Sequence, residues 1–323
     1  MMDDKQKQPN DVAYPEPQDQ AKFADEDTVF SRLNLHPSVY AILALIGIFF
    51  LYQIIGGGIT LLLFGLDFTD DNVQAIRLAT MLGQIIFLLI PTLILIRFQT
   101  KNIFKFVRMK PIGFAEVFFI TIGVIAAQQF LQGYLVLQDM IPLPEAIKPF
   151  IESMRESIEQ MYQTLVMVQT APELLFVILV VALVPAFSEE VLFRGLVQRN
   201  FEYSFGLAGG AVVAGIIFAL YHLNPFTLVP LMVLGIVFGL LVYKTGSILA
   251  AILAHFVNNL VAVISVYYRR EEILLPAEAE PAITGTIVVM LISGFIAVGC
   301  WVLLAKAADE RRKAQEQVKE KND

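Results

Sequence analysis

Long apolar segments separated by short polar ones run through most of this chain. Between residues 39 and 305 they occur at eight places. Each reaches, or nearly reaches, the ~20 residues that a helix needs to cross ~30 Å of hydrocarbon. The pattern therefore predicts an all-α, polytopic membrane bundle of about eight transmembrane helices. The predicted spans are residues 39–66, 76–97, 114–137, 172–198, 207–222, 226–243, 246–267 and 283–305.

Residues 144–170 follow a different pattern, in which apolar positions alternate spacings of four and three and charges fill the other face. This periodicity predicts one amphipathic helix, lying at the membrane surface as a connector or packing over the bundle as a lid. Its apolar positions are Ile147, Ile151, Met154, Ile158, Met161, Leu165 and Val168, and its charged ones are Lys148, Glu152, Arg155, Glu156 and Glu159.

Polar segments flank the apolar region, which spans residues 39–306. Residues 1–38 are acidic and contain proline, with no apolar stretch after a basic start, so they predict a disordered tail rather than a signal peptide. Residues 307–323 predict a charged extension. With the amino terminus inside, 18 of the 23 Lys and Arg residues fall in inner segments. This asymmetry predicts that both termini are cytoplasmic, in a cell membrane such as the bacterial inner membrane.

The composition agrees with a membrane protein. Hydrophobic residues make up 57% of the chain, charged residues only 16%, and the mean hydropathy is +0.67, whereas soluble domains are about 45–50% apolar. The net charge of -7 lies largely in tails and loops, and nothing in it suggests a nucleic-acid partner. The single cysteine, Cys300, excludes an intramolecular disulfide framework and a cysteine-based metal cluster.

Residues 188–195 place two carboxylates and a guanidinium inside an apolar span. A charge near the bilayer centre costs about 2.5–3.5 kcal/mol on translocon scales, so such groups pair or do chemistry. Glu190 and Arg194 are four apart in the order that favours an intrahelical ion pair. Glu189 projects about 100° away and remains the unpaired acid. A desolvated carboxylate is expected to have a raised pKa, which suits a general base acting on water.

Two histidines on later spans complete the candidate site. Phe218 precedes His222 by four residues, and Asn259 follows His255 by four, so each pair shares a helix face. At about 1.5 Å of rise per residue, Glu189 and both histidines reach comparable depths in the membrane. We interpret them as one site.

Two other features concern packing. Pro185 removes a helix hydrogen bond and frees the Val181 carbonyl, which predicts a kink or a water pocket. Gly235 and Gly239, one turn apart, predict a close helix-packing contact.

The motifs Glu-Glu-x-x-x-Arg, Phe-x-x-x-His and His-x-x-x-Asn occur in this order within residues 174–266. Their combination resembles the CAAX-processing and bacteriocin-processing (CPBP, or Abi) family of intramembrane glutamic endopeptidases, which includes type II CAAX prenyl endopeptidases. The resemblance implies a metal-free protease in which Glu189 activates water with help from His222, while His255 and Asn259 stabilise the oxyanion. It also implies a hydrophobic or lipidated peptide or protein substrate. By the same resemblance, the roles of Glu190, Arg194 and Phe218 are structural or supporting.

Three alternatives remain open. A zinc-dependent protease would use Glu189, His222 and His255 as ligands, because two histidines and a carboxylate form a known catalytic set. A proton-coupled transporter would also bury Glu and His, although the sequence has no inverted repeat. A non-catalytic immunity or scaffold protein could use the same bundle.

Overall fold

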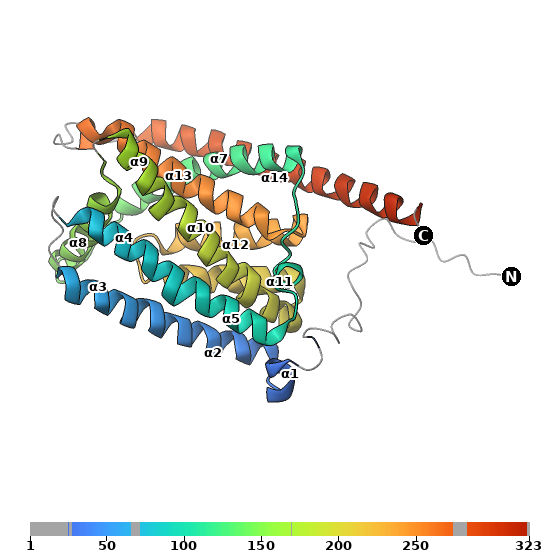
Figure 1. The fold of residues 1–323 in the computed structure, drawn as a ribbon. Helices are drawn as coiled ribbons and strands as arrows, with labels where there is room; N and C mark the ends of the chain where they lie inside the picture. The colour runs from blue at the N-terminus through green and yellow to red at the C-terminus, as the bar shows by residue number, and fades with distance from the viewer. Residues whose placement is uncertain (1–24, 26–27, 66–71, 169, 274–282, 322–323) are drawn as a thin grey trace.

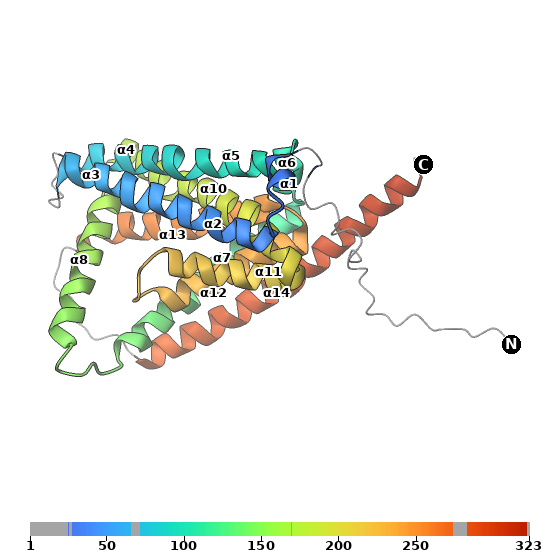
Figure 2. The same cartoon turned by 90° about the horizontal axis from the view of Figure 1, so that it is seen from below.

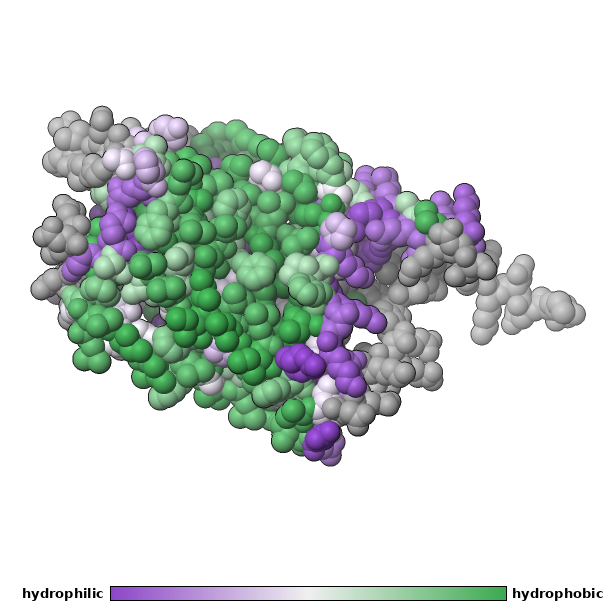
Figure 3. Space-filling model, viewed as in Figure 1, coloured by the Kyte–Doolittle hydropathy of each residue, from purple (hydrophilic) through white to green (hydrophobic). Residues whose placement is uncertain are grey.

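A computed structural model describes residues 25, 28–65, 72–168, 170–273 and 283–321. The described residues are 86% helical and contain no strand, so the predicted all-α class is confirmed. Seven helices in the described part of the chain are long and apolar enough to cross a membrane. The space-filling view shows an apolar side surface with hydrophilic residues gathered at its two ends (Figure 3). This is a multi-pass membrane protein.

The helices come in the following order. The first half contains α1 (Val29–Leu33), α2 (Pro37–Phe49), α3 (Gly57–Phe64), α4 (Val73–Gly83), α5 (Ile90–Gln99), α6 (Ile103–Phe106), α7 (Phe114–Asp139) and α8 (Lys148–Val166). The second half contains α9 (Ala171–Val177), α10 (Val184–Glu190), α11 (Gln198–Tyr221), α12 (Leu228–Thr245), α13 (Ile248–Ile273) and α14 (Ile283–Glu320). Four π-helical turns join neighbouring helices at Phe50–Gly56, Gln84–Leu89, Ile178–Leu183 and Val191–Val197.

One of the seven spans, the 51-residue Ala171–Tyr221, corresponds to two predicted ones. Its backbone leaves the helical region at Gly206, where φ is 70° and ψ is 172°, a conformation that glycine adopts without a Cβ clash. The chain turns back at Gly206. The contact between the rings of Phe193 and Phe218, whose centroids are 5.0 Å apart, shows that the segments before and after it lie side by side. Each of the eight predicted apolar segments therefore has a helical counterpart.

The bundle has two outer sides and a filled middle. Helices α2 to α5 form one side, α7 and α14 pack together on the opposite side, and α10 to α13 lie between them (Figures 1 and 2). The short helix α1 and the carboxyl-terminal end of α14 lie at the same end of the bundle (Figure 1). This placement is what an even number of crossings produces.

The beginning of the described chain is more ordered than predicted. Thr28 caps α1 by accepting from the Ser31 amide, and buried Phe30 packs edge-to-face on Tyr40 at 5.1 Å. The predicted disorder up to residue 38 is therefore wrong for residues 28–38, because one cap and one buried ring suffice to fold a turn onto α2. Residues 1–24 lie outside the described residues.

Helix α8 confirms the predicted amphipathic segment and crosses one end of the bundle at an angle to the spans (Figure 2). Val166 is its only buried residue, and Phe150 is 69% exposed. On its apolar face, Ile151, Met154, Ile158 and Leu165 are half-buried. Arg77 holds the end of α8: it donates to the Leu165 carbonyl at 2.9 Å and pairs with Glu173 at 2.6 Å. Arg77 lies in α4, and its side chain is fully buried.

Prolines and glycines shape the spans. The π-helical turns Gln84–Leu89 and Ile178–Leu183 each end two residues before a proline, Pro91 and Pro185, so the proline's missing N–H falls where the helix is already distorted. The predicted close contact at Gly235 is present: a Cβ there would lie 2.6 Å from the Gly215 carbonyl oxygen on α11.

Candidate active site

Glu189 faces His222 inside the bundle. Glu189 lies in α10, and its Oε2 is 3.7 Å from His222 Nε2. His222 directly follows α11, and its Nδ1 is 2.7 Å from the Phe218 carbonyl oxygen. A carbonyl oxygen only accepts, so Nδ1 carries a hydrogen and Nε2 is turned toward the carboxylate. In the neutral ring, Nε2 is then an acceptor.

The surroundings of Glu189 are polar but incompletely paired. Gln84 Nε2 donates to Glu189 Oε1 at 3.4 Å, and the hydroxyls of Tyr52 and Tyr221 lie within electrostatic range of this carboxylate. Glu189 Oε2, Gln84 Oε1 and Tyr221 Oη are buried without a hydrogen-bond partner in the protein. Buried polar atoms normally have partners, so such a cluster is typical of a place that takes up water or another polar molecule.

The sequence patterns did not single out Gln84, Tyr52 and Tyr221. Gln84 is an isolated polar side chain in an apolar span, while Tyr52 precedes Gln53 and Tyr221 precedes His222. A polar position inside a span is the only signal that could have marked them. Gln84 is 105 residues from Glu189 along the chain. Nothing in a single sequence places them together.

Glu190, by contrast, is sealed and is paired through one oxygen only, since its Oε2 is buried without a hydrogen-bond partner in the protein. Its Oε1 accepts from Arg194 Nη1 at 2.7 Å, so the predicted ion pair is confirmed. The same oxygen is 2.8 Å from His255 Nδ1, and Arg194 Nη2 donates to the Gly235 carbonyl at 2.7 Å. The side chains of Glu190 and Arg194 are both 0% exposed. Glu190 therefore has a second partner that the sequence did not reveal.

His255 is held on two sides. Its ring stacks on Phe238 with centroids 5.5 Å apart and an angle of 28°, while Nδ1 faces Glu190. Because the carboxylate accepts the Nδ1 hydrogen, Nε2 remains available, and it carries a hydrogen only when the ring is protonated.

Phe218 connects the two pairs. Its ring centroid lies 4.5 Å from that of His222 and 5.8 Å from that of His255. The Arg194 guanidinium carbon lies 4.9 Å from the same ring, within reach of a cation–π interaction. The structure thus brings members of the Glu189 pair and of the Glu190 pair into contact with one buried aromatic ring.

Asn259 contacts the carbonyl that Pro185 leaves without an N–H. Its Nδ2 donates to Val181 O at 3.0 Å, and its Oδ1 accepts from Asn258 Nδ2 at 3.1 Å. The predicted free carbonyl is satisfied across helices rather than by a water pocket. One Asn259 amide hydrogen remains for another acceptor.

The alternative zinc triad does not converge. In the described part of the chain, no group of three or more His, Cys, Asp or Glu side chains could hold a metal ion. His255 points its Nδ1 at Glu190, while His222 faces Glu189. Among the described residues, these three side chains thus do not form the group that a tetrahedral zinc site requires.

One segment of the chain matches a known family. Residues 171–261 match the type II CAAX prenyl endopeptidase Rce1-like family. This match confirms the predicted resemblance and indicates an intramembrane CAAX-type protease in general terms. The Rce1-like segment contains Glu189, His222, His255 and Asn259 but covers less than a third of the chain, and Gln84 lies outside it. No curated protein and no solved structure matches the chain.

Proposed function

We propose that this chain is an endopeptidase that hydrolyses a peptide bond of a membrane-associated, hydrophobic or lipidated peptide or protein, using water activated by Glu189. The observation that carries the proposal is the buried Oε2 of Glu189, which has no partner in the protein and faces His222 Nε2 at 3.7 Å within the Rce1-like segment.

The two acceptors explain how a water would be oriented. Glu189 takes one proton of the water as general base, and His222 Nε2 accepts the other hydrogen, which directs the oxygen lone pair at the scissile carbonyl carbon. The tetrahedral intermediate then breaks its C–N bond, and Glu189 returns the proton to the leaving nitrogen. Tethering of Nδ1 to the Phe218 carbonyl keeps His222 in this orientation.

His255 and Asn259 are our candidates for the oxyanion. His255 donates from Nε2 when its ring is protonated, and Glu190 stabilises that positive charge through Nδ1. Asn259 donates its second amide hydrogen while the first stays on Val181 O. Donors fixed in this way need no reorganisation when negative charge develops.

The test is cleavage by the purified full chain in proteoliposomes. A quenched fluorescent peptide carrying a carboxyl-terminal isoprenoid should be cut at an internal bond, and cutting should persist after exhaustive chelation. Activity that is lost to the chelator and restored by zinc would overturn the glutamate mechanism. The absence of cleavage of any lipidated or hydrophobic peptide would leave the non-catalytic alternative.

We also propose that both termini are cytoplasmic, because most basic residues lie in segments on that side. In a chain with Cys300→Ala, cysteines introduced as Lys5→Cys and Glu316→Cys should resist a membrane-impermeant thiol reagent on intact cells. Glu156→Cys, on the exposed face of α8, is the matched control and should be labelled. Labelling at one terminus but not the other would contradict an even number of crossings.

A further inference from the structure

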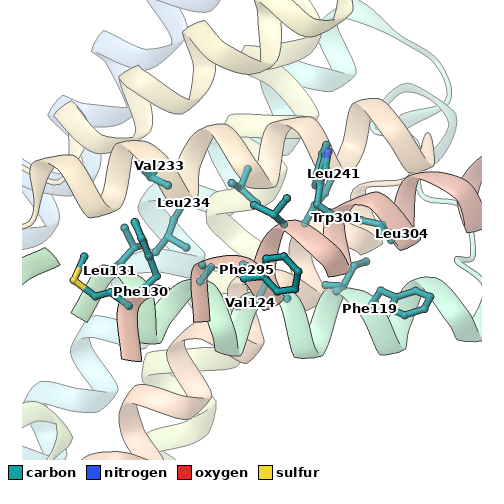
Figure 4. Close-up of a pocket in the computed structure, with 18 of the residues that line it drawn as sticks. Phe119, Val124, Phe130, Leu131, Val233, Leu234, Leu241, Phe295, Trp301 and Leu304 are labelled. Atoms are coloured by element: carbon teal, nitrogen blue, oxygen red, sulfur yellow. The ribbon is translucent and has the colours of Figure 1, made fainter. Parts of the chain in front are cut away.

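A groove of about 650 Å³ opens on the side of the bundle, away from Glu189. Helices α12 and α14 form its walls and α7 contributes the floor (Figure 4). Val233 and Leu241 line it from α12, whereas Gly235 and Phe238, which contact Arg194 and His255, lie on another face of that helix. The groove is therefore a separate feature from the candidate active site.

The lining accepts only hydrocarbon. All its side chains are apolar except Trp301, whose indole nitrogen is a donor. A polar ligand would leave its own groups unpaired there, at a cost of roughly 1–3 kcal/mol each. Ala127 and Ala297, together with two glycines, leave the space open, and its volume falls in the range of about 300–1,000 Å³ that is typical of ligand sites.

The groove is long as well as apolar. Its lining on α14 runs from Met290 to Leu304, which corresponds to roughly 21 Å at the helical rise. That length is about two thirds of the ~30 Å hydrocarbon thickness. An extended chain lying along the helices fits this shape better than a compact molecule.

One end of the groove leads to a basic residue. Lys244 follows Leu241 by one turn on the same face of α12, and its Nζ lies 5.7 Å from the Tyr243 ring centroid. Two neighbouring arginines already have acidic partners, Arg311 with Glu116 at 2.9 Å and Arg312 with Asp309 at 3.3 Å. Lys244 forms no ion pair within the described residues, so its charge is available to a negatively charged group.

We propose that this groove binds one acyl chain of an anionic phospholipid, with the phosphate of its headgroup at Lys244. The acyl chain supplies the hydrocarbon that the lining requires, and the phosphate supplies the negatively charged partner that Lys244 lacks. The proposal does not depend on the peptidase activity.

Trp301 offers a direct measurement, because it is the only tryptophan in the chain and it lines the groove. The full chain is reconstituted in phosphatidylcholine vesicles that contain increasing fractions of phosphatidylglycerol with brominated acyl chains, which quench nearby indoles. We expect these lipids to quench Trp301 with an apparent affinity about fivefold higher than brominated phosphatidylcholine, as one lysine near the headgroup predicts.

Four variants test the two parts of the site, the apolar groove and Lys244. Ala297→Phe fills the groove and should abolish the saturable quenching, whereas Ile296→Phe, at an exposed neighbouring position outside the lining, should leave it unchanged. Lys244→Gln should remove the preference for phosphatidylglycerol. Lys105→Gln, which changes an exposed lysine on α6, should retain it. Circular dichroism and size-exclusion profiles check that each variant is folded.

Three outcomes would overturn the proposal. The first is equal quenching by the two brominated lipids in the unaltered protein. The second is saturable quenching that survives in folded Ala297→Phe. The third is relief of quenching by an isoprenylated peptide at stoichiometric amounts, which would assign the groove to the lipid of a peptide substrate instead.

Discussion

Glu190 Oε1 makes two short contacts, to Arg194 and to His255, whereas adjacent Glu189 has only a 3.4 Å contact to Gln84 and faces His222 at 3.7 Å. The two carboxylates have the same chemistry and the same depth in the membrane. They differ because adjacent residues on a helix project about 100° apart. Glu190 points into the contact with α12 and α13, and Glu189 points toward the π-helical turn Gln84–Leu89 and the end of α11.

This difference suggests that Glu190 contributes to stability and Glu189 to reactivity. A buried carboxylate with two cationic or donating partners is held in place and costs several kcal/mol when one partner is lost. Each carboxylate has an unpartnered Oε2, but the Glu190 side chain is 0% exposed, whereas that of Glu189 is 14% exposed and faces His222. Glu189 is therefore the one that can accept a proton from a substrate or water. The four predictions that follow test whether the two neighbours divide these roles.

The largest expected effect is on catalysis at Glu189. Glu189→Gln keeps the side-chain shape and removes the base, so cleavage in proteoliposomes should fall at least about 1,000-fold, within the usual range for general-base loss. The melting temperature should stay close to that of the unaltered protein. Full activity of the purified variant would remove Glu189 as the base.

Glu190→Gln should act on folding instead. Arg194 would remain a buried cation without its counter-charge, which typically costs about 3–5 kcal/mol. The yield of monodisperse protein and the melting temperature report this loss.

A double variant provides the matched control for this prediction. Glu190→Leu together with Arg194→Met removes both charges, so it should be more stable than Glu190→Gln alone. If Glu190→Gln melts at the temperature of the unaltered protein, the sealed pair is not the stabilising element that we describe.

Asn259→Ala should have an intermediate effect. It removes both the bond to Val181 O and the proposed oxyanion donor, and loss of one such donor typically costs ~100 to 1,000-fold in rate. Asn258→Ala is the neighbouring control, because it loses only the bond to Asn259 Oδ1. A turnover rate for Asn259→Ala no lower than that for Asn258→Ala would show that Asn259 only braces the helices.

The smallest effect is expected at Gln84. Gln84→Leu removes the donor that orients Glu189, and a single hydrogen bond of this kind corresponds to about tenfold in kcat. KM should change little, since Gln84 holds the carboxylate rather than the substrate.

The control for Gln84 is another buried glutamine farther along the same span. Gln99 exchanges two hydrogen bonds with Asn200 at 2.7 and 3.1 Å, so Gln99→Leu should lower the melting temperature and leave kcat unchanged. Equal losses of kcat in both variants would mean that Gln84 has only a structural role.

Patterns within single helices were open to prediction from the sequence. Apolar runs of about 20 residues defined the spans, because the bilayer sets that length. A 3.6-residue period marked α8, and the spacing of four identified the pair of Glu190 with Arg194. Three motifs on three spans were enough to indicate the family that the comparison confirms for residues 171–261.

The tertiary structure alone decided how these helices face one another. The turn at Gly206 brings His222 back to Glu189, and the approach of α13 gives Glu190 a second partner in His255. Asn259 meets the carbonyl exposed by Pro185, and Gln84 arrives from a span 105 residues earlier. Such contacts depend on the crossing angles and relative heights of packed helices. Helical periodicity determines only which face a residue occupies, so one sequence does not contain them in readable form.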